Sequence, residues 1–453
     1  EYCGDAGKLN DRLSDNTCET CNTYNMLKLT RNLFAVKPTS ELGDYYERAL
    51  YNHILASQNP TNGMMCYFVP LRMGTKKEFS DQFNTFTCCV GSGIENHSKY
   101  TEGIYYEGKD GSLYANLFIP SELNWKSTGV KVKQETTFPE SNKISVTIEG
   151  PKKFALKVRQ PKWSNDLSFT INGKKAKATK ADAGFWTIDR SWGKNDKVEI
   201  TTTLSLYTES MPDNPNRVAM LYGPVVLAGK LGTTMPDPIY GTTVLLTDNR
   251  QVSDWAKPTG TPLTFQNTVA KPDQITLVPF YQVYDQYYNV YWDYFTTKEW
   301  TARQAEYEAE KKRIADIEAR TIDIMRIGEM QPERDHNLKA SEKSYVSDAL
   351  GRMGREVRSG GFFEWDMKVQ PDVSSALLCT YIGDDKNRGF DYLIDGVKIA
   401  TEELKGATTG RFFDVEYPIP AELLKGKTKV VVRVQGHPNK TAGRVFGCRV
   451  VRR

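Results

Sequence analysis

The sequence predicts an α+β protein of several domains, in which a helical N-terminal region is followed by antiparallel β-sandwiches. A chain of 453 residues is long enough for roughly two to four domains. Apolar residues recur at helical spacing up to about residue 107, and from about residue 113 they alternate with polar residues. We therefore expect helices over residues 1–107, a β-sandwich region over 108–298, a helical connector over 299–330 and a C-terminal β-sandwich over 331–453.

Two helices are expected early in the chain. The first lies between Thr20 and Val36 and ends before Pro38, and its apolar side chains recur at helical spacing at Met26, Leu29 and Leu33. The second begins near Ser40, a plausible N-cap, and ends near Asn59. Its apolar stripe consists of Tyr46, Leu50, His53 and Ile54. The short connection predicts an αα-hairpin, in which the histidine is packed rather than a metal ligand.

Short runs with a period of two predict the strands. Ile144, Val146 and Ile148 alternate with polar residues, and Asn172-Gly173 is typical of a turn between such runs. A charged segment from about residue 299 to 322 interrupts the pattern and predicts a connecting helix. The period of two then returns, as in Val430-Val431-Val432, so a second sandwich is expected near the C-terminus.

An aromatic cluster in the C-terminal region has two interpretations. Phe362, Phe363 and Trp365 could present a face to a sugar, together with Asp391 and Tyr392. They could instead fill the interior of the sandwich. Aromatic residues at strand spacing are usually buried, which favours the second interpretation.

The charge and the lengths of the apolar stretches each argue against one broad class of function. The chain has 60 Lys and Arg against 56 Asp and Glu, a formal net charge of +4, and no basic block predicts a nucleic-acid groove. No stretch approaches the roughly 18 uninterrupted apolar residues that a membrane-spanning helix requires. We expect a protein that binds no nucleic acid and spans no membrane, and these patterns leave its oligomeric state open.

Cysteines are concentrated near the N-terminus, where six of the eight precede residue 90. Cys18, Glu19 and Cys21 lie at the start of the first expected helix, and the vicinal pair Cys88-Cys89 follows later. A site with several thiolates and one carboxylate suits Zn²⁺ better than Mg²⁺ or Ca²⁺. Buried small residues or a disulfide would account for the same spacing, and that interpretation is kept for Cys3, Cys379 and Cys448.

Three segments carry a more specific pattern: residues 19–29 (ETCNTYNMLKL), 44–52 (DYYERALYN) and 88–97 (CCVGSGIENH). In this order they resemble the β-L-arabinofuranosidases of glycoside hydrolase families 127 and 146. Two later segments, residues 116–123 (NLFIPSEL) and 223–227 (GPVVL), also match. The resemblance therefore extends over most of the chain.

The resemblance implies a site built on zinc. The implied ligands are Glu19, Cys21, Cys88 and Cys89, with Cys88 as the nucleophile of a retaining mechanism. A metal lowers the pKa of a thiol, so a thiolate would be present at neutral pH. A retaining glycosidase also needs a general acid/base. The candidate is Glu1, because Glu1-Tyr2-Cys3-Gly4 takes the place of a Glu-His-Phe-Gly-like segment of the family.

Two further positions match substrate contacts of the family. Glu47 and Tyr67 would hydrogen-bond hydroxyl groups of the sugar and so fix it for attack. Each residue also has a purely structural interpretation. Glu47 could belong to a solvated helix face, and Tyr67 could be a half-buried strand residue. A family histidine two residues before the nucleophile is replaced here by Phe86, which leaves a related sugar possible.

The catalytic domain of the family is an (α/α)₆ barrel, of which residues 1–107 would supply only the later helices. The resemblance thus implies a partial barrel with an open helical layer, followed by the β-sandwich domains. The leading hypothesis is a zinc-dependent glycosidase, periplasmic or secreted, that releases β-linked L-arabinofuranose from plant-type oligo- or polysaccharides. The competing hypothesis is a non-catalytic protein in which zinc staples the helices and the sandwiches bind carbohydrate or are purely structural.

Overall fold

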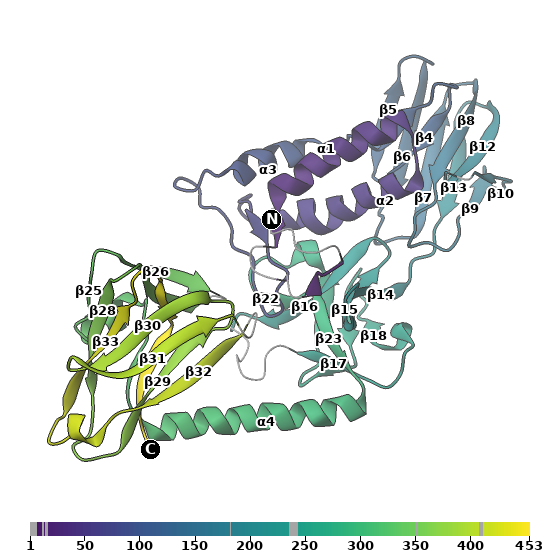
Figure 1. The fold of residues 1–453 in the computed structure, drawn as a ribbon. Helices are drawn as coiled ribbons and strands as arrows, with labels where there is room; N and C mark the ends of the chain where they lie inside the picture. The colour runs from purple at the N-terminus through teal and green to yellow at the C-terminus, as the bar shows by residue number, and fades with distance from the viewer. Residues whose placement is uncertain are drawn as a thin grey trace. The chain divides into compact units, whose positions relative to one another are not determined.

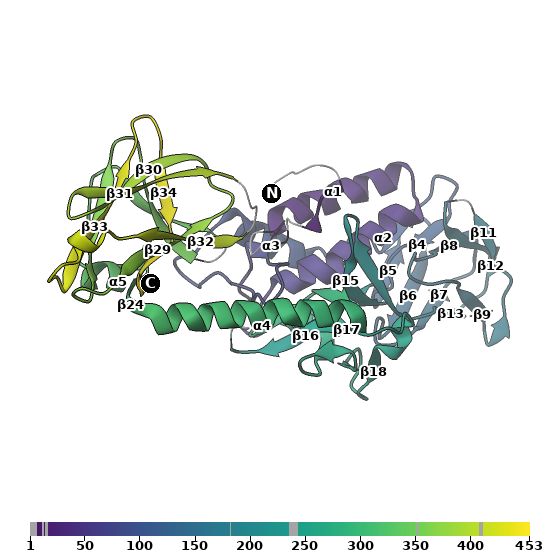
Figure 2. The same cartoon turned by 60° about the horizontal axis from the view of Figure 1, so that its bottom comes forward.

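The computed structural model describes residues 7–10, 13, 17–181, 183–234, 243–349, 352–406 and 411–453. The chain divides into two compact units, Glu1–Gln304 and Ala305–Arg453. Both units consist mainly of β-sheets, and the first also contains a layer formed by helices α1, α2 and α3 (Figures 1 and 2). In the part that is described, no helix is both long and apolar enough to cross a membrane.

The helical layer begins close to the predicted positions. It contains α1 (Thr20–Val36), α2 (Ser40–Ala49) and α3 (Cys88–Ser98), and α2 continues through a π-helical turn (Leu50–Ile54) and a 3₁₀ turn (Leu55–Ser57). The side chains that form its core are Leu27, Tyr46, Leu50, Ile54, Ile104 and Leu117. The N-cap of α2 is Thr39 and not Ser40: the Thr39 hydroxyl accepts a hydrogen bond from the Leu42 amide at 3.4 Å. Ser40 already belongs to the helix, so its side chain lies one position too late to cap it.

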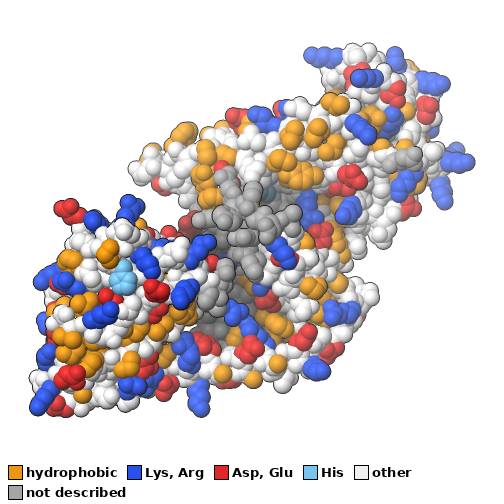
Figure 3. Space-filling view, in the orientation of Figure 1, with side chains coloured by type: hydrophobic (Ala, Val, Ile, Leu, Met, Phe, Trp, Pro, Cys, Tyr) orange, Lys and Arg blue, Asp and Glu red, His pale blue; other side chains and the backbone are white. Residues whose placement is uncertain are grey.

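One face of α1 is apolar and exposed. Met26, Leu29 and Leu33, whose spacing predicts the helix, are 39, 49 and 47 % exposed. The buried face carries Leu27 and Phe34 among others. Both sets have helical spacing, so the period predicts the helix but contacts with other elements decide which face is buried. Apolar side chains are accordingly visible on the surface over the helical layer (Figure 3).

A β-sandwich follows the helices. Its two sheets have the strand orders β10-β9-β13-β7-β6-β5 and β11-β12-β8-β4-β3. Inward-facing residues such as Val146, Leu156 and Val198 are fully buried, as the period of two predicts. The strands are β3 (Tyr105–Glu107), β4 (Leu113–Ala115), β5 (Ser121–Trp125), β6 (Val130–Thr136), β7 (Lys143–Glu149), β8 (Lys152–Arg159), β9 (Ser168–Ile171), β10 (Lys174–Lys175), β11 (Thr179–Ala181), β12 (Phe185–Trp192) and β13 (Asp196–Thr201).

A further sheet completes the first unit. Its strands follow the order β18-β19-β21-β16-β15-β23-β17-β20, with β14 paired to β15 and β22 to β16. Gly229 on β16 leaves room for the ring of Trp292, since a Cβ there would lie 2.2 Å from that ring. The strands are β14 (Leu206–Met211), β15 (Asn214–Tyr222), β16 (Val225–Gly232), β17 (Val244–Leu246), β18 (Ala256–Pro258), β19 (Phe265–Asn267), β20 (Ala270–Lys271), β21 (Thr276–Pro279), β22 (Tyr287–Asn289) and β23 (Tyr291–Phe295).

The second unit is a β-sandwich preceded by most of the charged helix α4 (Thr297–Arg320). Its sheets have the orders β24-β35-β29-β32, β25-β28-β33-β30-β31 and β26-β27-β34. Phe363 and Trp365 are buried and stacked, with ring centroids 5.7 Å apart, so they fill the core. The elements are β24 (Thr321–Met325), α5 (Met330–Asp335), β25 (Lys339–Ala340), β26 (Ser344–Ala349), β27 (Arg352–Val357), β28 (Phe362–Lys368), β29 (Ser375–Ile382), β30 (Lys386–Ile394), β31 (Val397–Lys405), β32 (Phe412–Pro418), β33 (Lys429–Gly436), β34 (Ala442–Val445) and β35 (Gly447–Arg452).

A buried arginine joins α2 to the first sandwich. The Arg159 guanidinium, at the end of β8, lies 2.5 Å from the Asp44 carboxylate and 2.6 Å from the Glu47 carboxylate, both on α2. Its Nε also donates to the Asn116 carbonyl at 2.6 Å. At Gly43 on α2, a Cβ would lie 2.3 Å from the Arg159 side chain, so the close approach requires glycine.

Replacing this arginine should destabilise the first unit. Arg159→Met leaves two carboxylates without their buried partner, and we expect a loss of about 3–5 kcal/mol in the free energy of unfolding. The matched control is Arg48→Met on the same helix, because the ion pair of Arg48 with Glu209 is partly exposed. It should cost about 1 kcal/mol or less. Urea denaturation followed by tryptophan fluorescence measures both, and equal losses would contradict this role of Arg159.

Candidate metal centre

Four side chains with metal-binding atoms meet at the N-terminal ends of α1 and α3. Glu19 ends the short strand β1 (Cys18–Glu19), Cys21 is the second residue of α1, and Cys88 and Cys89 are the first two residues of α3. One ligand atom from each residue lies within 4.8 Å of all the others. The structure therefore brings together the four residues that the motifs predict as metal ligands.

Strand pairing positions the start of α1. β1 pairs antiparallel with β2 (Phe68–Val69). The Thr20 amide donates to the Tyr67 carbonyl at 3.0 Å, and the Thr20 hydroxyl donates to the Cys66 carbonyl, also at 3.0 Å. These bonds fix the segment that carries Tyr67 against the first turn of α1, next to the four side chains.

The spacing of the thiols fits a small tetrahedral site. The Sγ atoms of Cys21 and Cys89 are 3.2 Å apart, and those of Cys88 and Cys89 are 3.9 Å apart. A tetrahedral zinc ion with Zn–S bonds of about 2.3 Å separates its sulfur ligands by about 3.8 Å. Small rotations of the Cys21 side chain would open the shorter distance. Three sulfurs and one carboxylate are also a donor set that zinc accepts, so these residues could hold that metal.

The two vicinal thiols differ in environment. Cys88 is exposed, and its Sγ lies 3.6 Å from the Tyr67 hydroxyl. Hydrogen bonding from Tyr67 to the thiolate is the main cause of a lowered Cys88 pKa. Cys89 is buried, and burial raises its pKa to about 12. Without a metal, Cys88 is therefore the easier of the two to ionise.

Glu47 makes its hydrogen bonds with Arg159 and Trp163 rather than with the thiols. Its carboxylate is 2 % exposed, so it does not belong to a solvated helix face. It accepts hydrogen bonds from Arg159 at 2.6 Å and from the Trp163 indole at 2.8 Å. Burial raises the Glu47 pKa, and the charge of Arg159 opposes that shift.

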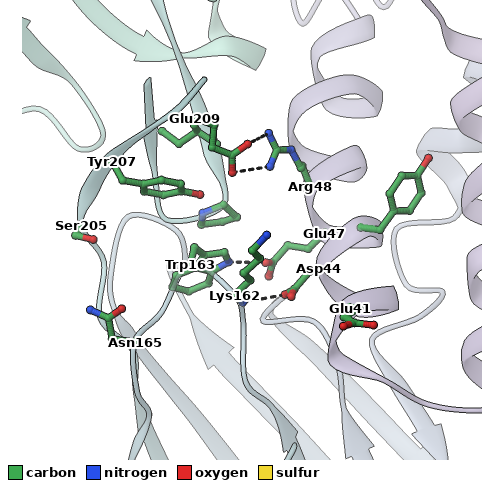
Figure 4. A pocket seen from close by; sticks show the side chains of 13 residues that line it. Glu41, Asp44, Glu47, Arg48, Lys162, Trp163, Asn165, Ser205, Tyr207 and Glu209 are labelled. Carbon is green, nitrogen blue, oxygen red and sulfur yellow. Dashed lines mark hydrogen bonds and ion pairs between the residues drawn. The ribbon is translucent and has the colours of Figure 1, made fainter. Parts of the chain in front are cut away.

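A pocket of about 680 Å³ lies beside this carboxylate (Figure 4). Figure 4 shows Glu47 and Asp44 of α2 facing Trp163 and Lys162 of the sandwich. The ion pair between Arg48 and Glu209 closes one side. The pocket thus combines carboxylates, an indole and cationic groups.

The histidine that the sequence predicts to be packed lies outside the cluster. His53 is packed, with its Nδ1 2.7 Å from the Thr23 hydroxyl, and burial lowers its pKa to about 4. It is absent from the four-residue cluster, as its position on an apolar stripe predicts. The acid/base candidate Glu1 lies outside the described residues.

Sequence patterns missed the residues that hold Glu47. Arg159 follows the alternating run that ends at Val158 and occupies an outward position of β8. Polar residues are expected at outward positions, so nothing in the pattern indicates that α2 buries this one. Trp163, two residues beyond Pro161, carries no periodic signal at all.

Comparison with protein families matches three parts of the chain. Residues 1–102 match the β-L-arabinofuranosidase GH127 catalytic domain, and residues 112–204 match the GH127 middle domain. These two matches confirm the resemblance that the three motifs predict. Residues 316–451 match a family of unknown function, DUF6805. No curated protein matches the chain.

Several solved structures share the fold of part of this chain. A glycoside hydrolase is 18 % identical, covering 62 % of this chain and 53 % of its own, with a TM-score of 0.51. A GH127 β-L-arabinofuranosidase from Geobacillus stearothermophilus T6 is 18 % identical, covering 62 % and 51 %, with a TM-score of 0.50. A further GH127 β-arabinofuranosidase is 20 % identical, covering 62 % and 50 %, with a TM-score of 0.50. The chain spans about half the length of these proteins, and the likeness is one of fold.

The reactivity of the vicinal thiols tests the geometry of the centre. In the metal-free chain we expect iodoacetamide to alkylate Cys88 before Cys89, because Cys88 is exposed and ionises more easily. Tyr67→Phe should raise the Cys88 pKa and so shift its alkylation to higher pH, since the phenyl ring cannot donate to the thiolate. Tandem mass spectrometry of the peptide that contains both cysteines, after alkylation at a series of pH values, measures how far each of them has reacted.

The control for that experiment is Tyr105→Phe. The Tyr105 hydroxyl bonds Ser121, outside the centre, so the change should leave the alkylation profile unaltered. If Tyr67→Phe also leaves the profile unaltered, the hydroxyl does not stabilise the Cys88 thiolate.

Proposed function

We propose that this chain, which carries matches to the GH127 catalytic and middle domains within residues 1–204, is part of a retaining glycoside hydrolase. It would release β-linked L-arabinofuranose from plant-type oligo- or polysaccharides. The observation that carries the proposal is the cluster of Glu19, Cys21, Cys88 and Cys89, in which one thiol remains open to solvent. A thiol that is open to solvent can be reached by a sugar, as a nucleophile must be.

The proposed nucleophile is Cys88. Its thiolate would attack the anomeric carbon of the sugar, a C–S bond would form, and the bond to the leaving oxygen would break. The general acid would protonate that oxygen and then, as a base, take a proton from the water that cleaves the thioether. We assign this second role to Glu1 on its motif. Bound zinc would supply positive charge that lowers the pKa of the thiols.

Tyr67 and Glu47 are the proposed substrate contacts. Tyr67 is supported by its hydroxyl, which lies 3.6 Å from the Cys88 sulfur and could also reach a sugar held there. The assignment of Glu47 rests on the motif, and its neighbouring pocket offers room for part of a saccharide. Phe86, where the family has a histidine, is 83 % exposed and presents an aromatic ring two residues before the nucleophile.

We further propose that the helical layer is the later part of an (α/α)₆ barrel. The apolar face of α1 supports this, because Met26, Leu29 and Leu33 are largely exposed and Val36 is 83 % exposed. Soluble proteins rarely leave such a face uncovered, and further helices of a barrel would cover it. As a degrader of plant-type glycans, the protein would act in the periplasm or outside the cell.

Zinc content tests the metal assignment. We expect the purified chain to retain close to one zinc ion after dialysis, and Cys89→Ser or Glu19→Gln to lose most of it, since each removes one of four ligands. Cys18→Ser is the matched control. Cys18 belongs to the same C-x-x-C pair as Cys21 but lies outside the cluster, so the variant should keep its zinc. Equal loss from Cys18→Ser would contradict the ligand set.

Glycosidase activity tests the reaction. We expect the chain to release p-nitrophenol from p-nitrophenyl β-L-arabinofuranoside, and Cys88→Ser to lower kcat by at least about 1,000-fold because a serine hydroxyl is a far weaker nucleophile. Cys18→Ser should retain activity. If only a longer form with upstream helices is active, the barrel proposal gains support. If the longer form, loaded with zinc, is also inactive, the sugar assignment fails and a zinc-stapled binding protein is favoured.

A further inference from the structure

Two cysteines outside the metal centre face each other in the core of the second unit. Cys379 on β29 and Cys448 on β35 lie directly opposite each other in an antiparallel pair. Their Sγ atoms are 3.5 Å apart, and both residues are 0 % exposed. Each is a free thiol, so two sulfurs stand close together with no bond between them.

The strand ladder places this pair at a favourable position. The Arg453 amide donates to the Ser374 carbonyl at 2.9 Å, which marks Ser374 and Arg453 as a hydrogen-bonded pair of the ladder. Such pairs alternate with non-hydrogen-bonded ones, and five steps along the same register lead to Cys379 and Cys448. Opposite residues at a non-hydrogen-bonded position have Cα atoms about 4.5 Å apart.

That separation matches the needs of a disulfide. Cα atoms joined by a disulfide are usually about 4.4–6.8 Å apart, and the sulfurs are about 2.05 Å apart. The backbone can therefore stay where it is, while rotation of the two side chains brings the Sγ atoms of Cys379 and Cys448 into bonding distance. Two cysteines that met only by chance in a core would have no reason to share one register position.

We propose that Cys379 and Cys448 form a structural disulfide when the chain folds in the presence of a disulfide oxidant. One thiolate attacks a sulfur of the external disulfide, forms a mixed disulfide and releases one thiol. The second cysteine then attacks its partner's sulfur, which forms the Cys379–Cys448 bond and releases the second thiol. Two electrons and two protons pass from the protein to the oxidant, which is reduced to two thiols.

The burial of the pair determines when the exchange can occur. In the folded unit neither sulfur is accessible, and burial raises the pKa of the Cys448 thiol, so attack on an external disulfide would be slow. The bond should instead form during folding, before β35 closes against β29. Once formed, it would be shielded from reductants in the same way.

The bond would link distant parts of the chain. The two cysteines are 69 residues apart, and β35 is the last strand, held between β24 and β29. Closing a loop of this size restricts the unfolded chain strongly, which is the usual source of stabilisation by a disulfide. The inference concerns the second unit alone and does not depend on the proposed glycosidase activity.

The direct test is to refold the full chain from its reduced, denatured state in a glutathione redox buffer. Remaining thiols are then blocked with N-ethylmaleimide, and the peptides are mapped by mass spectrometry without reduction. We expect a linked peptide pair containing Cys379 and Cys448, lighter than the reduced pair by two hydrogen atoms. Recovery of both cysteines as N-ethylmaleimide adducts, or of either one linked elsewhere, would overturn the proposal.

A stability measurement adds a readout that does not rely on mapping. The thermal midpoint of the second unit should be higher in the oxidised chain than in the same chain refolded with reductant, by roughly 5–15 °C. The double variant Cys379→Ala/Cys448→Ala is the control, and its midpoint for that unit should be the same with and without reductant. If the thermal midpoint of the wild-type second unit is the same after refolding with and without reductant, the disulfide is contradicted, whether or not the variant folds well.

Discussion

The buried guanidinium of Arg159 is the interaction on which the arrangement of the first unit depends. It projects from the outward face of β8, and two carboxylates of α2 and one backbone carbonyl surround it. A charge in such a place is tolerated only when its partners are in position, so α2 is held to one location on the sandwich.

The candidate metal centre depends on a simple property of helices. Successive residues of an α-helix point about 100° apart, so Cys88 and Cys89 at the start of α3 face different surroundings although they are neighbours in sequence. One thiol is turned toward solvent and Tyr67, and the other is buried next to Cys21. A vicinal pair at the start of a helix therefore gives one cluster an exposed sulfur and a buried one.

The sequence predicted the centre far better than its surroundings. The grouping of Glu19, Cys21, Cys88 and Cys89 could be predicted because each lies in a short segment that resembles a motif of a known family. The alternation of Ile144, Val146 and Ile148 likewise predicted a buried strand face. In contrast, the exposure of Met26 and Leu29 depends on which elements pack against α1, and a period of 3.6 carries no information about that.

The residues that join elements distant in sequence were the least predictable. Arg159 occupies an outward position of its strand, where the sequence pattern is the same for a buried and for a solvent-exposed polar residue. Its burial follows only from the placement of α2. The opposition of Cys379 and Cys448 follows from strand register, which cannot be read before the order of the strands in the sheet is known. Contacts of this kind are set by topology, whereas a ligand motif or an alternating strand is set by a few consecutive residues.

The composition of helix α4 has a consequence for how such proteins diversify. Among its residues, Ile317 is the one that is buried, and it packs on Ala376, Leu378 and Val451 of the second unit. Much of the rest of the helix is charged and is supported by local pairs such as Arg320 with Asp316. The C-terminal sandwich has a hydrophobic core of its own and matches a separate protein family, so it has the features of a unit that can be joined as a whole to different partner domains.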